Sequence, residues 1–288
     1  MLETRNAQAA LFMVLSMLSF SIGDVSIKAI GSDMPLSQLL VLRGVMACAF
    51  FLWLAYRNGH LQFDLGARNW QLLSVRSAAE TGAAWMFLTA LIHMPLANAN
   101  AIMQSIPLVV TLGAAAVLGE TVGPRRWTAI VIGFLGMLLI VRPGTGGFNI
   151  YALCALGAVF CVSARDLATR GLTERVPSLL VSLLGSAAVL GFGIVLSATD
   201  IWVRLTPWLV AMVLLQTVAI VAAYHFSVQT MRIGQAGFTA PFRYVSLVFA
   251  LVFGLVFFGH WPDLLTIFGA VIIVGTGLYV MWRERMTA

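Results

Sequence analysis

Ten apolar runs, most of them about 20 residues long, constrain this sequence more than any other feature. A bilayer core about 30 Å thick takes about 20 helical residues to cross. Sixty per cent of the 288 residues are hydrophobic and 10% are charged, whereas a soluble domain carries about 25% charged residues. The runs are continuously apolar rather than alternating, which argues against a β-barrel. We therefore predict an all-α integral membrane protein with ten transmembrane helices. The runs are Ala7–Ile30, Leu36–Tyr56, Trp70–Ile92, Leu96–Leu118, Arg126–Val141, Ile150–Thr169, Pro177–Ala198, Pro207–Met231, Gln235–Phe258 and Leu264–Trp282.

The distribution of arginine between the runs predicts the orientation of the chain. If the N-terminus is cytoplasmic, the outer loops hold only Arg142 and Arg204. Such an excess of basic residues on one side is typical of cytoplasmic loops. We expect an inner-membrane protein with both termini in the cytoplasm. Because the basic residues are scattered, the net charge of +6 does not indicate a nucleic-acid partner. The cytoplasmic residues would be Arg5, Arg57, Arg68, Arg125, Arg126, Arg170, Arg175, Arg232, Arg283 and Arg285.

The sequence contains an internal repeat. Asp24 and Asp166 are 142 positions apart, as are Lys28 and Arg170. This spacing divides the chain into units 1–148 and 149–288, each with five spans. Because five is odd, the two units should lie in the membrane in opposite orientations around a central cavity, as in alternating-access carriers. The alternative is an old duplication kept only for packing.

A specific resemblance supports this organisation. The segment "LANANAIMQSIPLVVTLGAAAVLGETVGPRRWTAIVIGFLGMLLIVRPG" resembles the EamA-type repeat of the drug/metabolite transporter superfamily. "APFRYVSLVFALVFGLVFFGHWPDLLTIFGAVIIVGTGLYVMWRE" is similar to its second half, with His260 where the family usually has Glu. The resemblance implies a ten-helix carrier that binds substrate between its two repeats. "FSIGDVSIK", "GPRRWTAIVIGFLG" and "TAPFRYVSLV" are similar to bacterial members that move S-adenosylmethionine or riboflavin.

Charged residues near span ends are candidates for gating or coupling. Asp24 and Lys28 are four positions apart on one helix face and can neutralise each other. Arg43 enters the second span from the same side, and Arg165 and Asp166 occupy the corresponding place in the sixth span. One interpretation makes these groups latches on the outer and inner gates. The other makes them helix-end anchors whose side chains extend to the headgroups.

Arg76 and Glu80 form another pair spaced by four residues, deep in the third span. A carboxylate at this depth needs a partner or a polar cavity. Glu80 is the first candidate for proton coupling or for contact with a cationic substrate group, and Arg76 would hold it. A purely structural ion pair is the alternative.

Polar residues also mark one face of the fourth and ninth spans. Asn100 and Gln104 lie four positions apart, and Pro107 should kink the fourth span beside them. In the ninth span, Arg243 and Tyr244 suit the binding of a carboxylate or stacking on a heterocycle. A contact of Arg243 with Glu80 or with a backbone carbonyl is the alternative.

The remaining candidates lie in the third, eighth and ninth spans. Gln216 and Tyr224 share a face of the eighth span. Trp85 and Phe238 are candidate stacking surfaces for an aromatic ligand.

These features favour a secondary transporter of a small organic metabolite. We rank riboflavin or a similar heterocycle first, S-adenosylmethionine uptake second, and export of an amino acid or other metabolite third. We expect no catalytic residues, no metal and no cofactor, and we disfavour an intramembrane enzyme or a channel. We also expect protons as the coupling ion, and a protein that is a monomer or a weak dimer.

Overall fold

A computed structural model describes residues 2–61, 63–118, 124–142, 149–173, 175–233 and 240–287, and these residues contain helices and no strand. The fold is therefore all-α in the described part, as predicted. The helices are α1 (Leu2–Ile30), α2 (Leu36–Arg57), α3 (Gly66–His93), α4 (Leu96–Met103), α5 (Ile106–Leu118), α6 (Pro124–Val141), α7 (Ile150–Arg170), α8 (Ser178–Leu196), α9 (Pro207–Ile233), the 3₁₀ helix η1 (Ala240–Tyr244), α11 (Val245–Phe258) and α12 (Leu264–Thr287).

Length and composition identify the helices that can cross a membrane. Six described segments are long and apolar enough to do so: α1, α2, α4 with the start of α5, α7, α8 and α9. Three shorter apolar helices match the fifth, ninth and tenth predicted spans. The remaining span is α3, which carries Arg68, Arg76 and Glu80. Each of the ten predicted spans thus corresponds to a helix or to a helix pair.

Two of the predicted spans are interrupted. The fourth is divided into α4 and α5 at Gln104 and Ser105. Pro107 lies in the first turn of α5, where a proline is tolerated. In one continuous helix it would lack an N–H to donate, and its ring would clash with the preceding turn. The ninth begins as the 3₁₀ helix η1, which contains Pro241, and continues as α11. The predicted kink at Pro107 is therefore a break between two helices.

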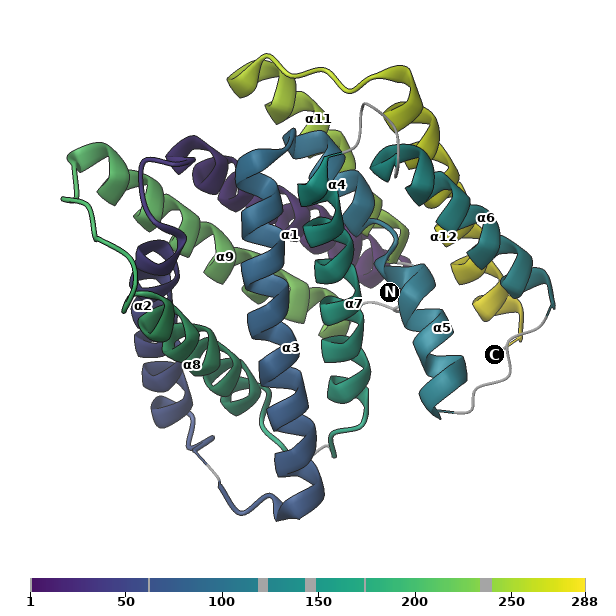
Figure 1. The fold of residues 1–288 in the computed structure, drawn as a ribbon. Coiled ribbons are helices and arrows are strands. Elements are labelled where there is room, and N and C mark those ends of the chain that lie inside the picture. The colour runs from purple at the N-terminus through teal and green to yellow at the C-terminus, as the bar shows by residue number, and fades with distance from the viewer. Residues whose placement is uncertain are drawn as a thin grey trace.

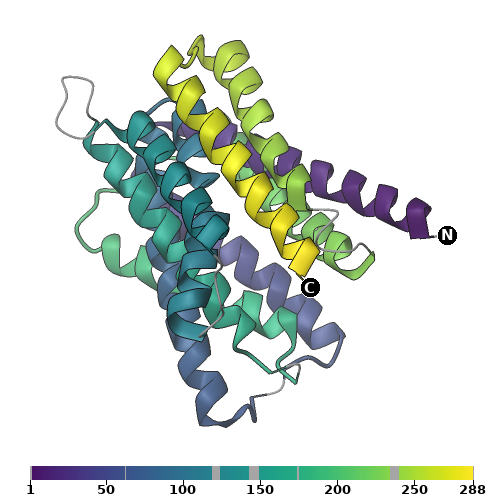
Figure 2. The ribbon, with the colours of Figure 1, turned by 90° about the vertical axis from the view of Figure 1, so that its right-hand side faces the viewer.

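The helices pack in pairs that join the first half of the chain to the second. The most extensive contacts are α1 with α9, α3 with α7, α2 with α8, and α6 with α12 (Figures 1 and 2). Exchanging each span for its counterpart in the other unit converts the α1–α9 pair into the α3–α7 pair. The same exchange leaves the α2–α8 and α6–α12 pairs unchanged. The contacts of the two units therefore correspond to each other.

Glycine allows the closest of these helix crossings. A Cβ placed on Gly269 in α12 would lie 2.5 Å from the carbonyl oxygen of Gly136 in α6. A Cβ placed on Gly44 in α2 would lie 2.9 Å from the Cβ of Leu190 in α8. Small residues at such positions let helix backbones approach within van der Waals contact. Both helix pairs that join corresponding spans are packed in this way.

Candidate functional site

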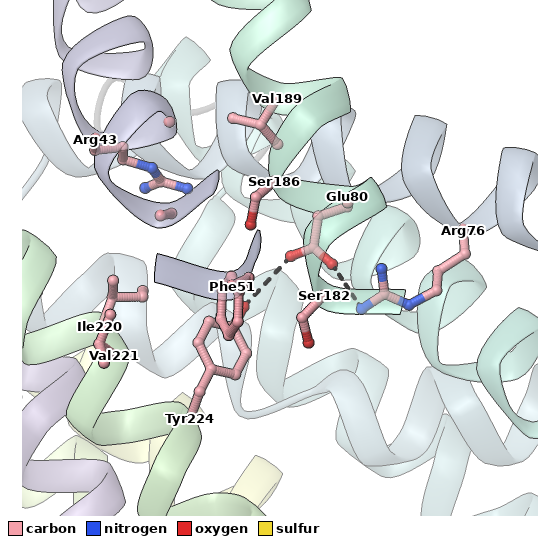
Figure 3. A pocket seen from close by; sticks show the side chains of 13 residues that line it. Arg43, Phe51, Arg76, Glu80, Ser182, Ser186, Val189, Ile220, Val221 and Tyr224 are labelled. Carbon is pink, nitrogen blue, oxygen red and sulfur yellow. Dashed lines mark hydrogen bonds and ion pairs between the residues drawn. The ribbon is translucent and has the colours of Figure 1, made fainter. Parts of the chain in front are cut away.

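A cavity lies between α2, α3, α8 and α9, where the two units meet. Its volume of about 50 Å³ is small beside the ~300–1,000 Å³ of typical small-molecule sites. In this conformation it has room for one small polar group, so an organic metabolite would require the helices to move apart. It is lined by Arg43, Gly44, Ala47, Phe51, Arg76, Glu80, Ser182, Gly185, Ser186, Val189, Ile220, Val221 and Tyr224 (Figure 3).

Glu80 is the hub of the charged groups in this cavity. Its Oε2 forms an ion pair with Arg76 Nη2 at 3.2 Å, which confirms the predicted pair one turn apart on α3. Its Oε1 accepts from Arg165 Nη1 on α7 at 3.2 Å. The Tyr224 hydroxyl on α9 donates to the same oxygen at 3.5 Å (Figure 3). One carboxylate therefore joins α3 to two helices of the second unit.

Arg165 and Arg76 extend this network toward the end of the bundle where α3 begins and α7 ends. Arg165 also donates from Nε and Nη2 to Asp166 Oδ1, at 3.0 and 2.9 Å. Arg76 donates to Thr169 Oγ1 on α7 at 3.2 Å and to the carbonyl oxygen of Val181 on α8 at 3.3 Å. The candidates Arg76, Glu80, Arg165 and Asp166 thus form one polar cluster on one side of the cavity.

Gly185 creates the space for Arg76. A Cβ on Gly185 would lie 2.7 Å from Arg76 Nη1 and 3.7 Å from Glu80 Oε2. Real Cβ atoms do not approach heavy atoms this closely, so the guanidinium lies directly against the α8 backbone. Gly185 therefore positions the ion pair without contributing a polar group.

Arg43 lines the opposite wall of the cavity, on α2. Its guanidinium points into the space that Ser186 and Glu80 also face (Figure 3). It interacts electrostatically with Glu80, Asp24 and Tyr224 but makes no hydrogen bond or ion pair with a residue that the structure describes. Arg43 was predicted as a gating residue, and its position in the cavity also suits substrate contact.

Asp24 and Lys28 do not form the expected ion pair. Lys28 Nζ donates to the carbonyl oxygens of Leu91 and Met94, at 3.1 and 2.8 Å, and lies 5.6 Å from the ring centroid of Phe258. These carbonyls end α3, where the unpaired C=O groups and the helix dipole attract a cation. Asp24 Oδ2 instead accepts from Asn100 Nδ2 at 3.2 Å. Each of the two charged groups is therefore satisfied by another helix and not by its neighbour on α1.

The polar stripe of the fourth span lies away from the cavity. Asn100 contacts Asp24, and Gln104 Nε2 donates to Ser246 Oγ on α11 at 2.7 Å. Arg243 is exposed at the end of η1 and does not line the cavity. Tyr244 is buried beside Gly277, and its hydroxyl has no hydrogen-bond partner among the residues that the structure describes. These four candidates therefore belong to the contact region of α1, α4, η1 and α11.

Of the last three candidates, the two that the structure describes are also outside the cavity lining. Gln216 is fully buried on α9, and both polar atoms of its amide lack a hydrogen-bond partner. Trp85 is 42% exposed and packs edge-on against Phe192. Phe238 lies outside the described residues. Whether these residues contact a substrate stays a prediction.

Sequence reasoning missed several residues that line the cavity, including Phe51, Ser182 and Ser186. Ser182 and Ser186 were detectable in principle, because they are spaced four positions apart in the otherwise apolar α8. Phe51 carried no signal, because it is one apolar residue among many. Among the residues searched, no three His, Cys, Asp or Glu side chains lie close enough to hold a metal ion.

Comparison with known families shows to which family the chain belongs. The model of the EamA-like transporter family matches residues 7–142 and again residues 149–282. The chain belongs to the EamA-like transporter family. It is therefore a multi-pass membrane transporter, and each matched copy of the EamA domain contains five of the predicted spans.

Individual relatives of this EamA-like chain are similar over nearly their whole length. A riboflavin transporter of Rhizobium johnstonii is 27% identical, covering 98% of this chain and 93% of the relative. An S-adenosylmethionine uptake transporter of Rickettsia prowazekii is 24% identical, with 95% and 92% covered. A pseudopaline exporter of Pseudomonas aeruginosa is 26% identical, with 92% of each chain covered. A crystal structure of a protein 19% identical superposes with a TM-score of 0.66, over 98% of this chain and 100% of that one.

Proposed function

We propose that this EamA-like protein is a secondary carrier of a small organic metabolite that works by alternating access. The observation that carries the proposal is the charged cavity between α2, α3, α8 and α9, at the junction of the two units. Transporter folds built from two repeats place substrate at the repeat interface near the bilayer midplane. In this account Glu80 and Arg76 form part of the substrate or coupling site.

The two units, 1–148 and 149–288, are proposed to be inverted repeats. Two facts support this: each unit has five spans, and the helix contacts between the units are converted into one another when the units are exchanged. We place the protein in the cell inner membrane with both termini in the cytoplasm. In this orientation the cluster around Arg165 and Asp166 lies on the cytoplasmic side of the cavity. Asp24 then lies on the outer side. These residues are the proposed gating groups.

The substrate ranking remains riboflavin or a similar flat heterocycle, then S-adenosylmethionine, then an exported metabolite. The first two are the molecules named for relatives of this chain, and an exporter is also among them. Phe51 and Tyr224 supply the aromatic walls that a heterocycle would contact. The proposed partners are the substrate, the lipid bilayer and protons, with no nucleic acid, and the carrier acts as a monomer or weak dimer.

A counterflow experiment tests the carrier function. The purified protein would be reconstituted in liposomes loaded with unlabelled riboflavin or S-adenosylmethionine, and uptake of the labelled compound measured. A carrier gives saturable, transient accumulation of label, whereas a channel gives none and an enzyme alters the compound. Absence of counterflow with both of these compounds and with a panel of amino acids would contradict the proposal.

A further inference from the structure

The cavity contains an arginine that no carboxylate of the described residues contacts directly. Two arginines line it, and Arg76 is paired with Glu80. Arg43 is partly buried and makes no hydrogen bond or ion pair with any residue in the described ranges. A guanidinium inside a membrane-spanning segment is costly unless an anion or water accompanies it. The cavity therefore presents to whatever enters a guanidinium that has no direct partner among the described residues.

The nearby carboxylates are held by other groups. Glu80 forms an ion pair with Arg76 and accepts hydrogen bonds from Arg165 and Tyr224. Asp166 accepts from two nitrogens of Arg165. Asp24 accepts from Asn100; its charge acts on Arg43 electrostatically, but the two side chains form no ion pair. The anion that suits Arg43 must therefore come from outside the described side chains.

The surroundings of Arg43 favour a carboxylate over a phosphate. The cavity-lining residues lie a turn or more inside their helices, so no helix N-terminus offers its backbone N–H groups to a phosphate. A single guanidinium matches the charge and the two oxygens of one carboxylate in a bidentate pair. The Ser186 hydroxyl faces the same space (Figure 3) and can donate to a carboxylate oxygen. The free volume of about 50 Å³ accommodates a group of that size.

We propose that Arg43 anchors a carboxylate of the transported molecule, so that this carrier selects carboxylate-bearing metabolites. The inference rests on the proposed carrier function and specifies its substrate class. Phe51, Val189 and Ile220 would contact the apolar part of the same molecule once the helices separate. A zwitterionic amino-acid moiety satisfies this requirement, whereas an uncharged heterocycle without a carboxylate does not. This inference therefore places S-adenosylmethionine, which carries such a moiety, ahead of riboflavin in the ranking given above.

Binding to matched pairs of compounds tests the proposal. The pairs are S-adenosylmethionine with its decarboxylated form, indole-3-acetate with indole-3-acetamide, and benzoate with benzamide. Thermal unfolding of the purified, monodisperse protein in detergent would report binding of each. We expect the carboxylate member of at least one pair to stabilise the wild type at a concentration at least tenfold lower than its partner. Equal effects within every pair, or no effect of any carboxylate, would overturn the proposal.

Variants assign the preference to Arg43. Arg43→Gln should abolish the preference, and Arg43→Lys should weaken it several-fold, because lysine keeps the charge but cannot form the bidentate pair. The matched control is Arg57→Gln, since Arg57 is exposed at the end of α2 and lies 5.4 Å from the ring centroid of Trp53. That control should bind as the wild type does. An unchanged preference in Arg43→Gln contradicts the proposal, and if that variant does not fold, an unchanged preference in Arg43→Lys does so.

The counterflow experiment separates this inference from the carrier function. A wild type that shows saturable counterflow but no preference for carboxylates would leave the carrier function standing and refute the role of Arg43. Failure of counterflow with every compound would refute the carrier function itself.

Discussion

Glu80 contacts three polar side chains, which come from three helices, and its loss should have the largest effect of any single polar residue near the cavity. Glu80→Gln leaves Arg76 and Arg165 without their shared carboxylate, and all three side chains are at most 21% exposed. We expect a loss of ~1–3 kcal/mol in stability, as when a hydrogen-bonded charged group loses its partner. Transport should fall at least tenfold.

The measurements are thermal unfolding in detergent and counterflow in liposomes. Asp33→Asn is the matched control, because Asp33 is exposed in the turn between α1 and α2. The control should behave as the wild type in both assays. Wild-type stability in Glu80→Gln would mean that the two arginines do not depend on this carboxylate.

Substitution of two glycines on α8 tests whether Gly185 positions Arg76. The second substitution, at Gly191, controls for the general effect of alanine on the helix. Gly185→Ala introduces a Cβ 2.7 Å from Arg76 Nη1, whereas a Cβ on Gly191 meets no atom within 4 Å. Gly185→Ala should therefore displace Arg76 from Glu80 and lower transport. Gly191→Ala should be neutral or stabilise by up to ~1 kcal/mol, because alanine favours the helix. Equal transport by the two variants would refute the positioning role.

At this scale, the sequence predicts contacts within one helix better than contacts between helices. Arg76 and Glu80 are paired as their spacing indicates. Asp24 and Lys28 have the same spacing, yet each finds its partner on another helix. Lys28 binds backbone carbonyls, which are present at every residue and leave no signal in a sequence. The inter-helix contact of Glu80 with Arg165 was likewise not predictable from spacing.

At the scale of the helices, the close crossing of α6 and α12 requires a residue without a side chain at position 269. A Cβ on Gly269 would lie 2.5 Å from the Gly136 carbonyl oxygen, while a Cβ on Gly275, also in α12, meets nothing within 4 Å. Gly269→Ala should push the helices apart and destabilise the protein by ~1–3 kcal/mol, as over-packing does. Gly275→Ala is the control on the same helix. Thermal unfolding that is unchanged in both variants would contradict the close crossing.

An ion pair outside the spans also links these two helices, and it predicts a dependence on pH. Arg142 follows α6 and donates to Asp263, which precedes α12 and also accepts from the Thr266 N–H. The hydrogen bond from Arg142 is the main reason that the pKa of Asp263 is lowered from 3.8 to about 2. Because the pKa is lower in the folded state, the stabilisation is complete above about pH 4 and is lost as the pH falls toward 2.

This effect should be small, because the Asp263 side chain is 52% exposed and solvent screens the pair. We expect thermal unfolding of the wild type to shift downward between pH 4 and pH 3 more than that of Asp263→Asn. Identical pH profiles of the two proteins would show that this pair does not contribute to stability.

The sequence predicted where the helices lie better than it predicted where a helix is interrupted. Apolar length located the spans because lipid requires about 20 apolar residues in each crossing. The division of the fourth span at Gln104 and Ser105 was expected only as a kink at Pro107. A proline removes one hydrogen bond, and whether the helix bends or stops depends on neighbours that can satisfy the freed groups. Here Ser105 donates to the Ile102 carbonyl oxygen at 2.7 Å, and Gln104 binds Ser246.

At the scale of the whole molecule, the internal repeat predicted two units around a central cavity, but it did not predict which spans would line that cavity. The sequence drew attention to the fourth and ninth spans because their polar residues interrupt apolar runs. It also named Arg43, Arg76, Glu80 and Tyr224, and these four residues do line the cavity. The cavity lies instead between the second, third, seventh and eighth spans, where small and hydroxyl side chains such as Gly185 and Ser186 leave space. Cavities depend on how side chains pack between helices, and residue types alone do not specify that packing.

Alternating access from both sides of the membrane is the property on which this account depends. Ser186→Cys would be made in a background where Cys48, Cys154 and Cys161 are replaced by serine, and the protein reconstituted in liposomes. A membrane-impermeant thiol reagent would then be applied from one side or the other. We predict labelling from both sides, slowed by the transported compound. Labelling from only one side, under turnover conditions and in both orientations of the protein, would contradict a cavity that opens alternately to each side.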